Sequence, residues 1–121
     1  MNITKELKKI TEYFSPSIIE EVNEVYIKLV KINGDKVPWH QHKNEDELFY
    51  VLEGSLVMEI ENLHPFVMKK GDIYTVKKGL KHRVSSTKEC SIMLIENKST
   101  LHTGDTKSEI TKSITKQLGK Y

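Results

Sequence analysis

The sequence has little cysteine and no long apolar run, and each absence excludes a class of protein. Cys90 is the single cysteine among 121 residues, so no internal disulfide can form. A helix that spans a bilayer needs about 20 consecutive apolar residues, and no stretch approaches that length. The first residues, MNITKELKKITEYF, lack the apolar segment of a secretory signal. We therefore expect a cytoplasmic protein that makes no membrane contact.

An excess of charge of one sign is also missing. The chain has 19 basic and 17 acidic residues, and Arg83 is its single arginine. Binding to nucleic acid depends on a concentrated basic surface that displaces phosphate counterions. Two lysine pairs, at 69–70 and 77–78, flank predicted strands, and we interpret them as solvated turn residues. We predict no nucleic-acid partner.

The apolar residues near the N-terminus have helical spacing. They predict a short amphipathic helix or helical turn within residues 3–14, covering one end of the domain. The residues concerned are Ile3, Leu7, Ile10 and Phe14. Pro16 then interrupts the pattern, because proline removes a backbone donor and disfavours helix before it.

From residue 25 the apolar pattern changes to a period of two. Within residues 25–32, Val25, Ile27 and Leu29 share one face and Lys28 falls on the other, which predicts a strand. Further strands are predicted within residues 48–60 and 67–76 and over residues 83–86 and 92–95, with glycines at the turns. Gly54, within the first of these stretches, suits a hairpin or a sharp bend. Many short strands without an intervening helix are typical of a sandwich or barrel.

The last part of the chain is polar until a final apolar repeat. Ile110, Ile114 and Leu118 recur every four residues before Gly119, which predicts a C-terminal helix. A length of 121 residues suits one domain of ordinary size. We therefore predict a single domain over residues 1–121, with a core at 25–96, an N-terminal extension at 1–24 and a tail at 97–121.

Two of the five histidines have the spacing of a metal-binding pair. In a strand, His40 and His42 project from the same face, about 7 Å apart along the chain. Both imidazoles can then converge on one ion at roughly 2.0–2.2 Å. His64, in a turn, and His102, in the polar tail, are interpreted as exposed side chains.

Glu47 and His82 are candidates to complete the site. Glu47 follows the polar loop KNED, where the chain can turn back and bring a carboxylate beside the histidine pair. His82 follows the turn at Gly79 and begins another predicted strand. Spacing alone leaves the convergence of His82 open.

The residues around this site resemble the first motif of the cupin superfamily. That motif is a glycine, five residues, H-x-H, three or four residues, a glutamate, six residues and a glycine. Residues 34–54 read G-DKVPW-H-Q-H-KNED-E-LFYVLE-G, and every fixed position is filled.

Residues 71–86, G-DIYTV-K-K-G-LK-H-RVS-S, resemble the second cupin motif. Gly71, Gly79 and His82 are in place, while Lys77 stands where the motif has proline and Ser86 where it has asparagine. The resemblance implies an all-β fold, a double-stranded β-helix or jelly-roll barrel. It also implies that the three histidines and Glu47 line its interior and bind one divalent metal ion. The ligand types suit Fe, Mn, Ni, Co, Zn or Cu.

Residues that share the parity of Glu47 on its strand should form the wall of a pocket. Phe49 and Val51 meet this condition and make the pocket partly apolar, which suits a small organic ligand. Trp39 has the opposite parity to the histidine pair, so we expect it to pack outside the barrel or at a partner surface. Candidates for a further titratable group near the metal are Tyr26, Tyr50 and Tyr74.

The sequence leaves the function open between two main classes. One is a metal-dependent enzyme, either a dioxygenase or an isomerase or lyase. The other is a non-catalytic, metal-bearing module that binds or senses a small molecule, because no general acid or base is evident beside the metal. The intact ligand set argues against a purely structural barrel. Since cupins of this size commonly pair, we expect a homodimer in which a second subunit covers the strand at 25–32.

Overall fold

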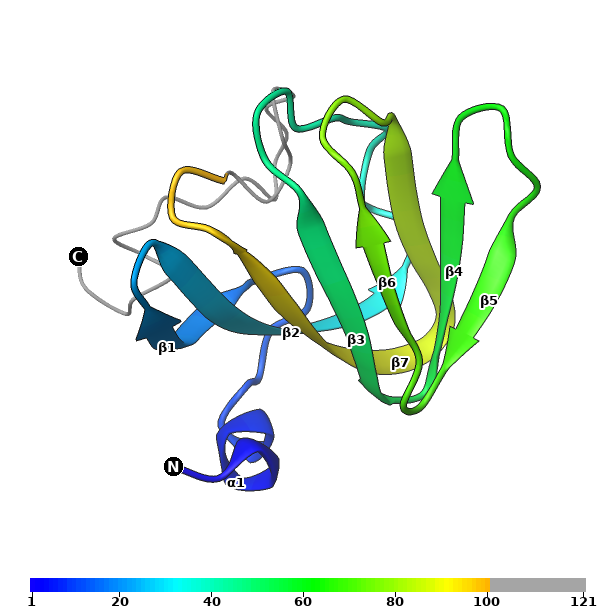
Figure 1. Ribbon diagram of the computed structural model, residues 1–121. Helices are drawn as coiled ribbons and strands as arrows, with labels where there is room; N and C mark the ends of the chain where they lie inside the picture. Colours follow the sequence, from blue (N-terminus) through cyan, green and yellow to red (C-terminus); the bar gives the residue numbers. More distant parts are fainter. Residues whose placement is uncertain (101–121) are drawn as a thin grey trace.

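The computed structural model describes residues 1–100, and most of this part of the chain is β-structure. Within it lie one helix, α1 (Ile3–Lys8), and seven strands. The strands are β1 (Ser17–Val22), β2 (Val25–Gly34), β3 (Glu47–Glu53), β4 (Ser55–Ile60), β5 (Phe66–Lys69), β6 (Ile73–Val76) and β7 (His82–Asn97). Figure 1 shows the strands curling around a common interior, which confirms the predicted all-β barrel. No helix of residues 1–100 is long and apolar enough to cross a membrane.

The longest strand, β7, connects the two halves of the barrel. One half has the strand order β1-β2-β7-β3-β6, and in the other half β4 pairs with both β5 and β7. Every pairing is antiparallel. The first residues of β7 pair with β4, and its last residues pair with β2 and β3. This arrangement makes β7 a member of both sheets.

The sequence predicted two strands where the structure has the single strand β7 of 16 residues. His82 and Glu96 are 14 positions apart on it, which is about 46 Å along a flat strand at roughly 3.3 Å per residue. Both side chains nevertheless interact with Glu47. The strand therefore bends strongly, as Figure 1 shows, and its two ends approach the same point in the interior.

Inward and outward residues alternate along the strands. On β3, Glu47, Phe49 and Val51 are buried, as their parity predicted. On β2, Lys28 lies on the face opposite Ile27 and Leu29, as predicted. The barrel core, however, lies on the face of Lys28, with Val30 and Ile32. The buried core cluster consists of Phe14, Val30, Ile32, Phe49, Val51, Leu56, Met58, Ile60, Met68, Val76, Val84, Cys90, Ile92 and Leu94.

The chain changes sheets at a sharp bend between β3 and β4. The sequence allowed either a hairpin or a bend here, and the structure has the bend, because the two strands pair with other partners. Gly54 adopts φ +84°, a left-handed conformation that favours glycine. A Cβ atom at this position would lie 2.6 Å from the backbone oxygen of Glu89. Both the backbone conformation and the close approach therefore require glycine.

The N-terminal segment differs from its prediction in two respects. The helix covers only Ile3–Lys8 and has no buried residue, so it does not cover an end of the core as expected. Residues 17–22 form a strand that was not predicted, and this strand pairs with β2. As a result, β2 lies between β1 and β7 and is not the open edge that we expected at residues 25–32. The predicted C-terminal helix and His102 lie outside the described residues.

Candidate metal centre

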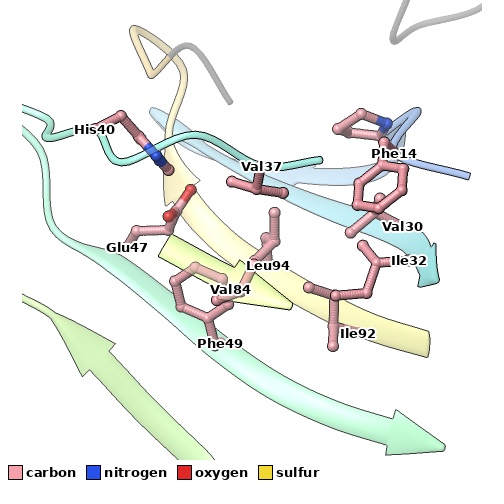
Figure 2. A pocket seen from close by; sticks show the side chains of 11 residues that line it. Phe14, Val30, Ile32, Val37, His40, Glu47, Phe49, Val84, Ile92 and Leu94 are labelled. Atoms are coloured by element: carbon pink, nitrogen blue, oxygen red, sulfur yellow. The ribbon is translucent and has the colours of Figure 1, made fainter. Parts of the chain in front are cut away.

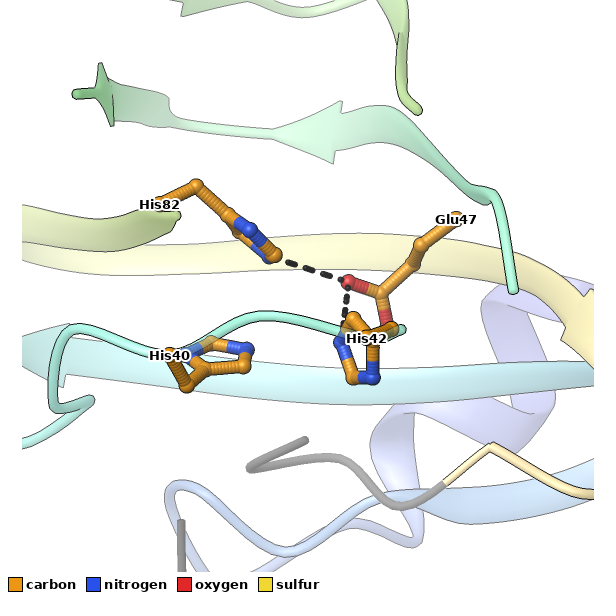
Figure 3. Close-up of side chains that lie close together, drawn as sticks. All are labelled: His40, His42, Glu47 and His82. Atoms are coloured by element: carbon orange, nitrogen blue, oxygen red, sulfur yellow. Dashed lines mark ion pairs between the residues drawn. The ribbon is translucent and has the colours of Figure 1, made fainter. Parts of the chain in front are cut away.

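Three imidazoles and one carboxylate meet inside the barrel. They belong to His40, His42, Glu47 and His82, all of which are buried, and their potential ligand atoms lie within 4.8 Å of one another. Figure 3 shows the four side chains directed toward a common point. Two atoms that each lie about 2.1 Å from one ion are at most about 4.2 Å apart. The cluster therefore needs to contract by only about half an ångström to surround an ion.

Backbone hydrogen bonds bring His82 to the histidine pair, which the sequence alone had left open. The N–H of His40 donates to the oxygen of His82 at 3.0 Å, and the N–H of His82 donates back at 2.9 Å. The N–H of Gly79 donates to the oxygen of His42 at 2.8 Å. Three bonds thus attach the segment of the H-x-H motif to the turn that precedes β7. The ring centroids of His40 and His82 lie 4.3 Å apart.

Two of the imidazole rings are oriented by backbone carbonyl groups. Nδ1 of His40 lies 2.8 Å from the oxygen of Pro38, and Nδ1 of His82 lies 2.9 Å from that of Leu80. A neutral imidazole that donates from Nδ1 leaves the lone pair of Nε2 free to bind a metal. Nε2 of both rings is buried; among residues 1–100, Nε2 of His40 has no hydrogen-bond partner, and Nε2 of His82 lies 3.5 Å from Oε1 of Glu47. These two atoms therefore lie in the cluster, where they could bind a metal ion.

Glu47, the first residue of β3, lies close to the rings of His42 and His82. Its Oε1 atom is 3.5 Å from Nε2 of His42 and 3.5 Å from Nε2 of His82. Burial alone would raise the pKa of Glu47, but hydrogen bonds from Glu96, His42 and His82 outweigh this effect and lower it well below its usual value. The carboxylate is therefore ionised at neutral pH, as metal binding requires.

His40 is held in the neutral form. Burial, followed by repulsion from His82, lowers the pKa of His40 from 6.5 to about 4. The energetic cost of a positive charge in this position is therefore large. At neutral pH, no proton has to leave His40 before an ion binds.

Behind Glu47 lies a second buried group of charges, Lys28 and Glu96. Nζ of Lys28 is 2.6 Å from Oε1 of Glu96, and both side chains are 0% exposed. Glu96 stands directly opposite Glu47 in the pairing of β7 with β3. Burial, followed by the charge of Glu47, raises the pKa of Glu96 well above its usual value. Of the two carboxyl groups, Glu96 therefore holds a proton up to a higher pH, and in that form it can donate a hydrogen bond to Glu47.

This pair was not predicted from the sequence, although the sequence contained a signal for it. Lys28 was placed on the polar face of its strand, yet Val30 and Ile32 have the same parity. Two inward neighbours of equal parity indicate a buried lysine, which must have a partner of opposite charge. For Glu96, its position two residues after Leu94 on the inward face of β7 gives the same signal.

A small apolar cavity of about 40 Å³ adjoins the cluster. Figure 2 shows His40 and Glu47 on one side of it and Phe14 on the other. The residues that line it are Phe14, Pro16, Val30, Ile32, Val37, His40, Glu47, Phe49, Val84, Ile92 and Leu94. Phe14, Pro16 and Val37 lie outside regular strands, so periodicity gave no signal for them.

The pocket candidates from the sequence are only partly brought together. Phe49 lines the cavity, whereas Val51 is buried in the core cluster and does not line it. The three candidate tyrosines do not line it either. Tyr74 packs against Phe66 at 5.0 Å between ring centroids, and the ring of Tyr26 lies 5.3 Å from Nζ of Lys98. Tyr50 has the parity opposite to Glu47 on β3 and is half-buried.

The remaining residues that the sequence drew attention to lie outside the cluster. His64 is exposed, as expected, and Trp39 is 41% exposed with the guanidinium of Arg83 4.8 Å from its ring centroid. Cys90 is fully buried, and burial raises its pKa to about 11, which indicates a packing residue and not a reactive thiolate. Lys77, at the first departure from the motif, forms a surface ion pair of 3.6 Å with Asp46.

An antiparallel barrel with three inward histidines and one glutamate at these positions defines the cupin class of protein. The chain belongs to the cupin domain family, whose characteristic sequence matches residues 29–96. It is 34% identical over 96 residues to the uncharacterized protein YdbB of Bacillus subtilis strain 168. That alignment covers 79% of this chain and 81% of YdbB.

Two solved structures have the same fold at similar sequence identity. The first is a cupin-2 domain containing protein from Shewanella frigidimarina, with 33% identity, a TM-score of 0.77 and coverage of 80% of this chain and 93% of that chain. The second is protein NMB1881 from Neisseria meningitidis, with 31% identity, a TM-score of 0.73 and coverage of 80% and 97%. Both likenesses extend over most of each chain, so the resemblance expected from the two motifs is confirmed.

Proposed function

We propose that the cluster binds one divalent transition-metal ion, and that the metal-loaded protein binds or transforms a small organic molecule. The proposal is carried by the burial of four donor groups around one point, three imidazoles and the carboxylate of Glu47. Three neutral imidazoles and one carboxylate leave a divalent ion with a net positive charge. When bound, such an ion can polarise an oxygen atom of a ligand or lower the pKa of a bound water. The donor set suits Fe, Mn, Ni, Co, Zn or Cu.

The lining of the cavity supports the non-catalytic alternative as a second candidate. Among its described lining residues, His40 and Glu47 are the only ones with a titratable side chain, and both belong to the metal cluster. A general acid or base must lie within hydrogen-bond reach of the proton that it transfers. Catalysis at this site would therefore depend on the metal ion itself. Without such chemistry, the protein is a metal-bearing module that binds or senses its ligand.

Metal analysis of the purified protein tests the proposal. We expect about one equivalent of a divalent metal per chain, with strongly reduced metal in His40→Ala and His82→Ala. His64→Ala is the matched control, because His64 is exposed and outside the cluster, and it should retain the metal. Full metal content in His82→Ala would contradict the four-ligand site. Absence of bound metal after incubation with each candidate ion would contradict the proposal as a whole.

A further inference from the structure

The cavity beside the cluster has one polar side and otherwise apolar walls. His40 and Glu47 form the polar side, and the remaining nine lining residues are hydrocarbon or aromatic. Cavities with apolar walls stay dry and accept apolar groups, whereas polar groups placed in them lose their hydration without compensation. The part of a ligand that enters this cavity must therefore be apolar, while its polar part lies at the cluster.

The volume of the cavity limits the size of that apolar part. It measures about 40 Å³, well below the roughly 150 Å³ of a cavity that accepts benzene. The space is therefore sufficient for only a few non-hydrogen atoms. A sugar phosphate, which is larger and carries polar groups along its whole length, does not fit this description.

Phe14 forms the end of the cavity opposite the cluster (Figure 2). It lies outside the strands and is 7% exposed, with φ +57°, a left-handed conformation that is rare for a bulky residue. Such a conformation is strained and persists only where the surroundings enforce it. The segment that carries Phe14 is therefore held in place by specific contacts.

Three hydrogen bonds attach this segment to the barrel. The N–H of Phe14 donates to the backbone oxygen of Lys31 at 2.8 Å, and Nζ of Lys31 donates to the oxygen of Ile10 at 3.3 Å. The hydroxyl of Tyr13 donates to Oε1 of Glu89 at 2.8 Å. The contacts reach β2 and β7, so the position of the Phe14 ring is fixed relative to both strands.

We propose that the ligand of this protein has an anionic oxygen head that binds the metal and a short aliphatic body, and that Phe14 limits the length of that body. This inference rests on the proposed metal site, because the head needs the positive charge of the ion. Phe14 is a specificity-determining residue and takes no part in holding the metal. Removal of its ring opens the end of the cavity to a longer aliphatic chain.

A series of straight-chain hydroxamates, from acetyl to octanoyl, tests the inference on the cobalt-loaded protein. Binding is followed through the visible spectrum of Co²⁺, and cobalt content is measured separately. The wild type should bind the short members best and lose affinity beyond about four carbons. Phe14→Ala should move the optimum at least two carbons longer. Each buried methylene contributes about 0.8 kcal/mol, or roughly fourfold, so the longer probe should bind about 15-fold more tightly to this variant.

Two further variants keep the test decisive. Phe14→Leu removes less volume, so it remains usable if Phe14→Ala does not fold, and it should move the optimum by about one carbon. Phe66→Ala is the matched control, because Phe66 packs against Tyr74 and does not line the cavity, and it should keep the wild-type profile. Cobalt binding with an unchanged length profile in both Phe14 variants would overturn the inference and leave the metal site intact. Failure of the wild type to bind cobalt and each of the other candidate ions would overturn both proposals.

Discussion

Replacement of Lys28 by methionine would test whether Lys28 and Glu96 stabilise each other as a buried ion pair behind the candidate metal centre. Lys28 and Glu96 are both fully buried, with 2.6 Å between Nζ and Oε1. Methionine has nearly the same length as the lysine stem but cannot neutralise a carboxylate. Loss of one partner of a buried ion pair costs about 3–5 kcal/mol, because the other remains uncompensated. A small domain has only about 5–15 kcal/mol of stability, so the loss is large.

The cost of Lys28→Met should depend on pH. In the folded protein the pKa of Glu96 is already raised by burial and by Glu47, and loss of Lys28 raises it further. A group whose pKa is raised by folding, such as Glu96, contributes fully to the free energy of unfolding below its unfolded-state pKa. That contribution is lost as the pH rises through its folded-state pKa. Protonated Glu96 is tolerated in the variant, whereas ionised Glu96 is not. The free energy of unfolding should therefore fall further below wild type at pH 8 than at pH 5.

Urea unfolding of the metal-free variants at these two pH values provides the measurement. Lys70→Met is the matched control, because Lys70 forms an ion pair of 3.1 Å with Glu53 in which the side chains are 71% and 63% exposed. An exposed pair contributes about 0–1 kcal/mol. The double variant Lys28→Met/Glu96→Leu should recover most of the loss, since an apolar pair leaves no charge buried. The reasoning is refuted if Lys28→Met costs no more than Lys70→Met at pH 8.

Three other predictions concern the cluster and the assembly. In the Lys28→Met background, Glu96→Leu should weaken metal affinity about 10- to 100-fold, while Glu96→Gln, which can still donate to Glu47, should retain most of it in a competition titration. Because the pKa of His40 is lowered to about 4, metal-free protein should lose up to about 3 kcal/mol of stability as pH falls from 6.5 to 4. The urea midpoint, plotted against pH, should fall less steeply in His40→Gln than in the wild type. An equal slope in the two proteins would contradict this assignment. The homodimer stays a prediction, now with β1, one of the edge strands, as the strand that a second subunit would cover. Light scattering that shows a monomer at micromolar concentration would exclude it.

The sequence predicted the barrel and the four clustered residues because each depends on a strong local signal. The alternation after residue 25 predicts the strands, and the two motifs identify His40, His42 and Glu47 without any knowledge of long-range contacts. The strand expected at His40 and His42 is wrong, because both residues lie between β2 and β3, where His40 forms an isolated β-bridge with His82. Local sequence was not enough to place His82, because its approach to the other residues depends on backbone hydrogen bonds to His40 across the fold.

The features that escaped prediction depend on tertiary context. Residues 87–89 are polar and exposed, so they appeared to separate two strands, whereas they form the bend of one. Lys28 was placed on the polar face because burial of a lysine requires a partner that the local sequence does not contain. Phe14 belongs to no strand or helix, and its place in the cavity follows from contacts with β2 and β7.

The course of β7 also bears on how the barrel folds. Its first residue is His82, which pairs with Ile60 of β4, and Glu96 near its end pairs with Tyr26 and Glu47. A slip of one residue in either half would turn the inward side chains of that half outward, because side chains alternate with a period of two. His82 or Glu96 would then leave the interior together with its apolar neighbours. An ion that binds only the correctly paired barrel would stabilise that pairing over every slipped one, so metal supply during refolding should select the register of β7.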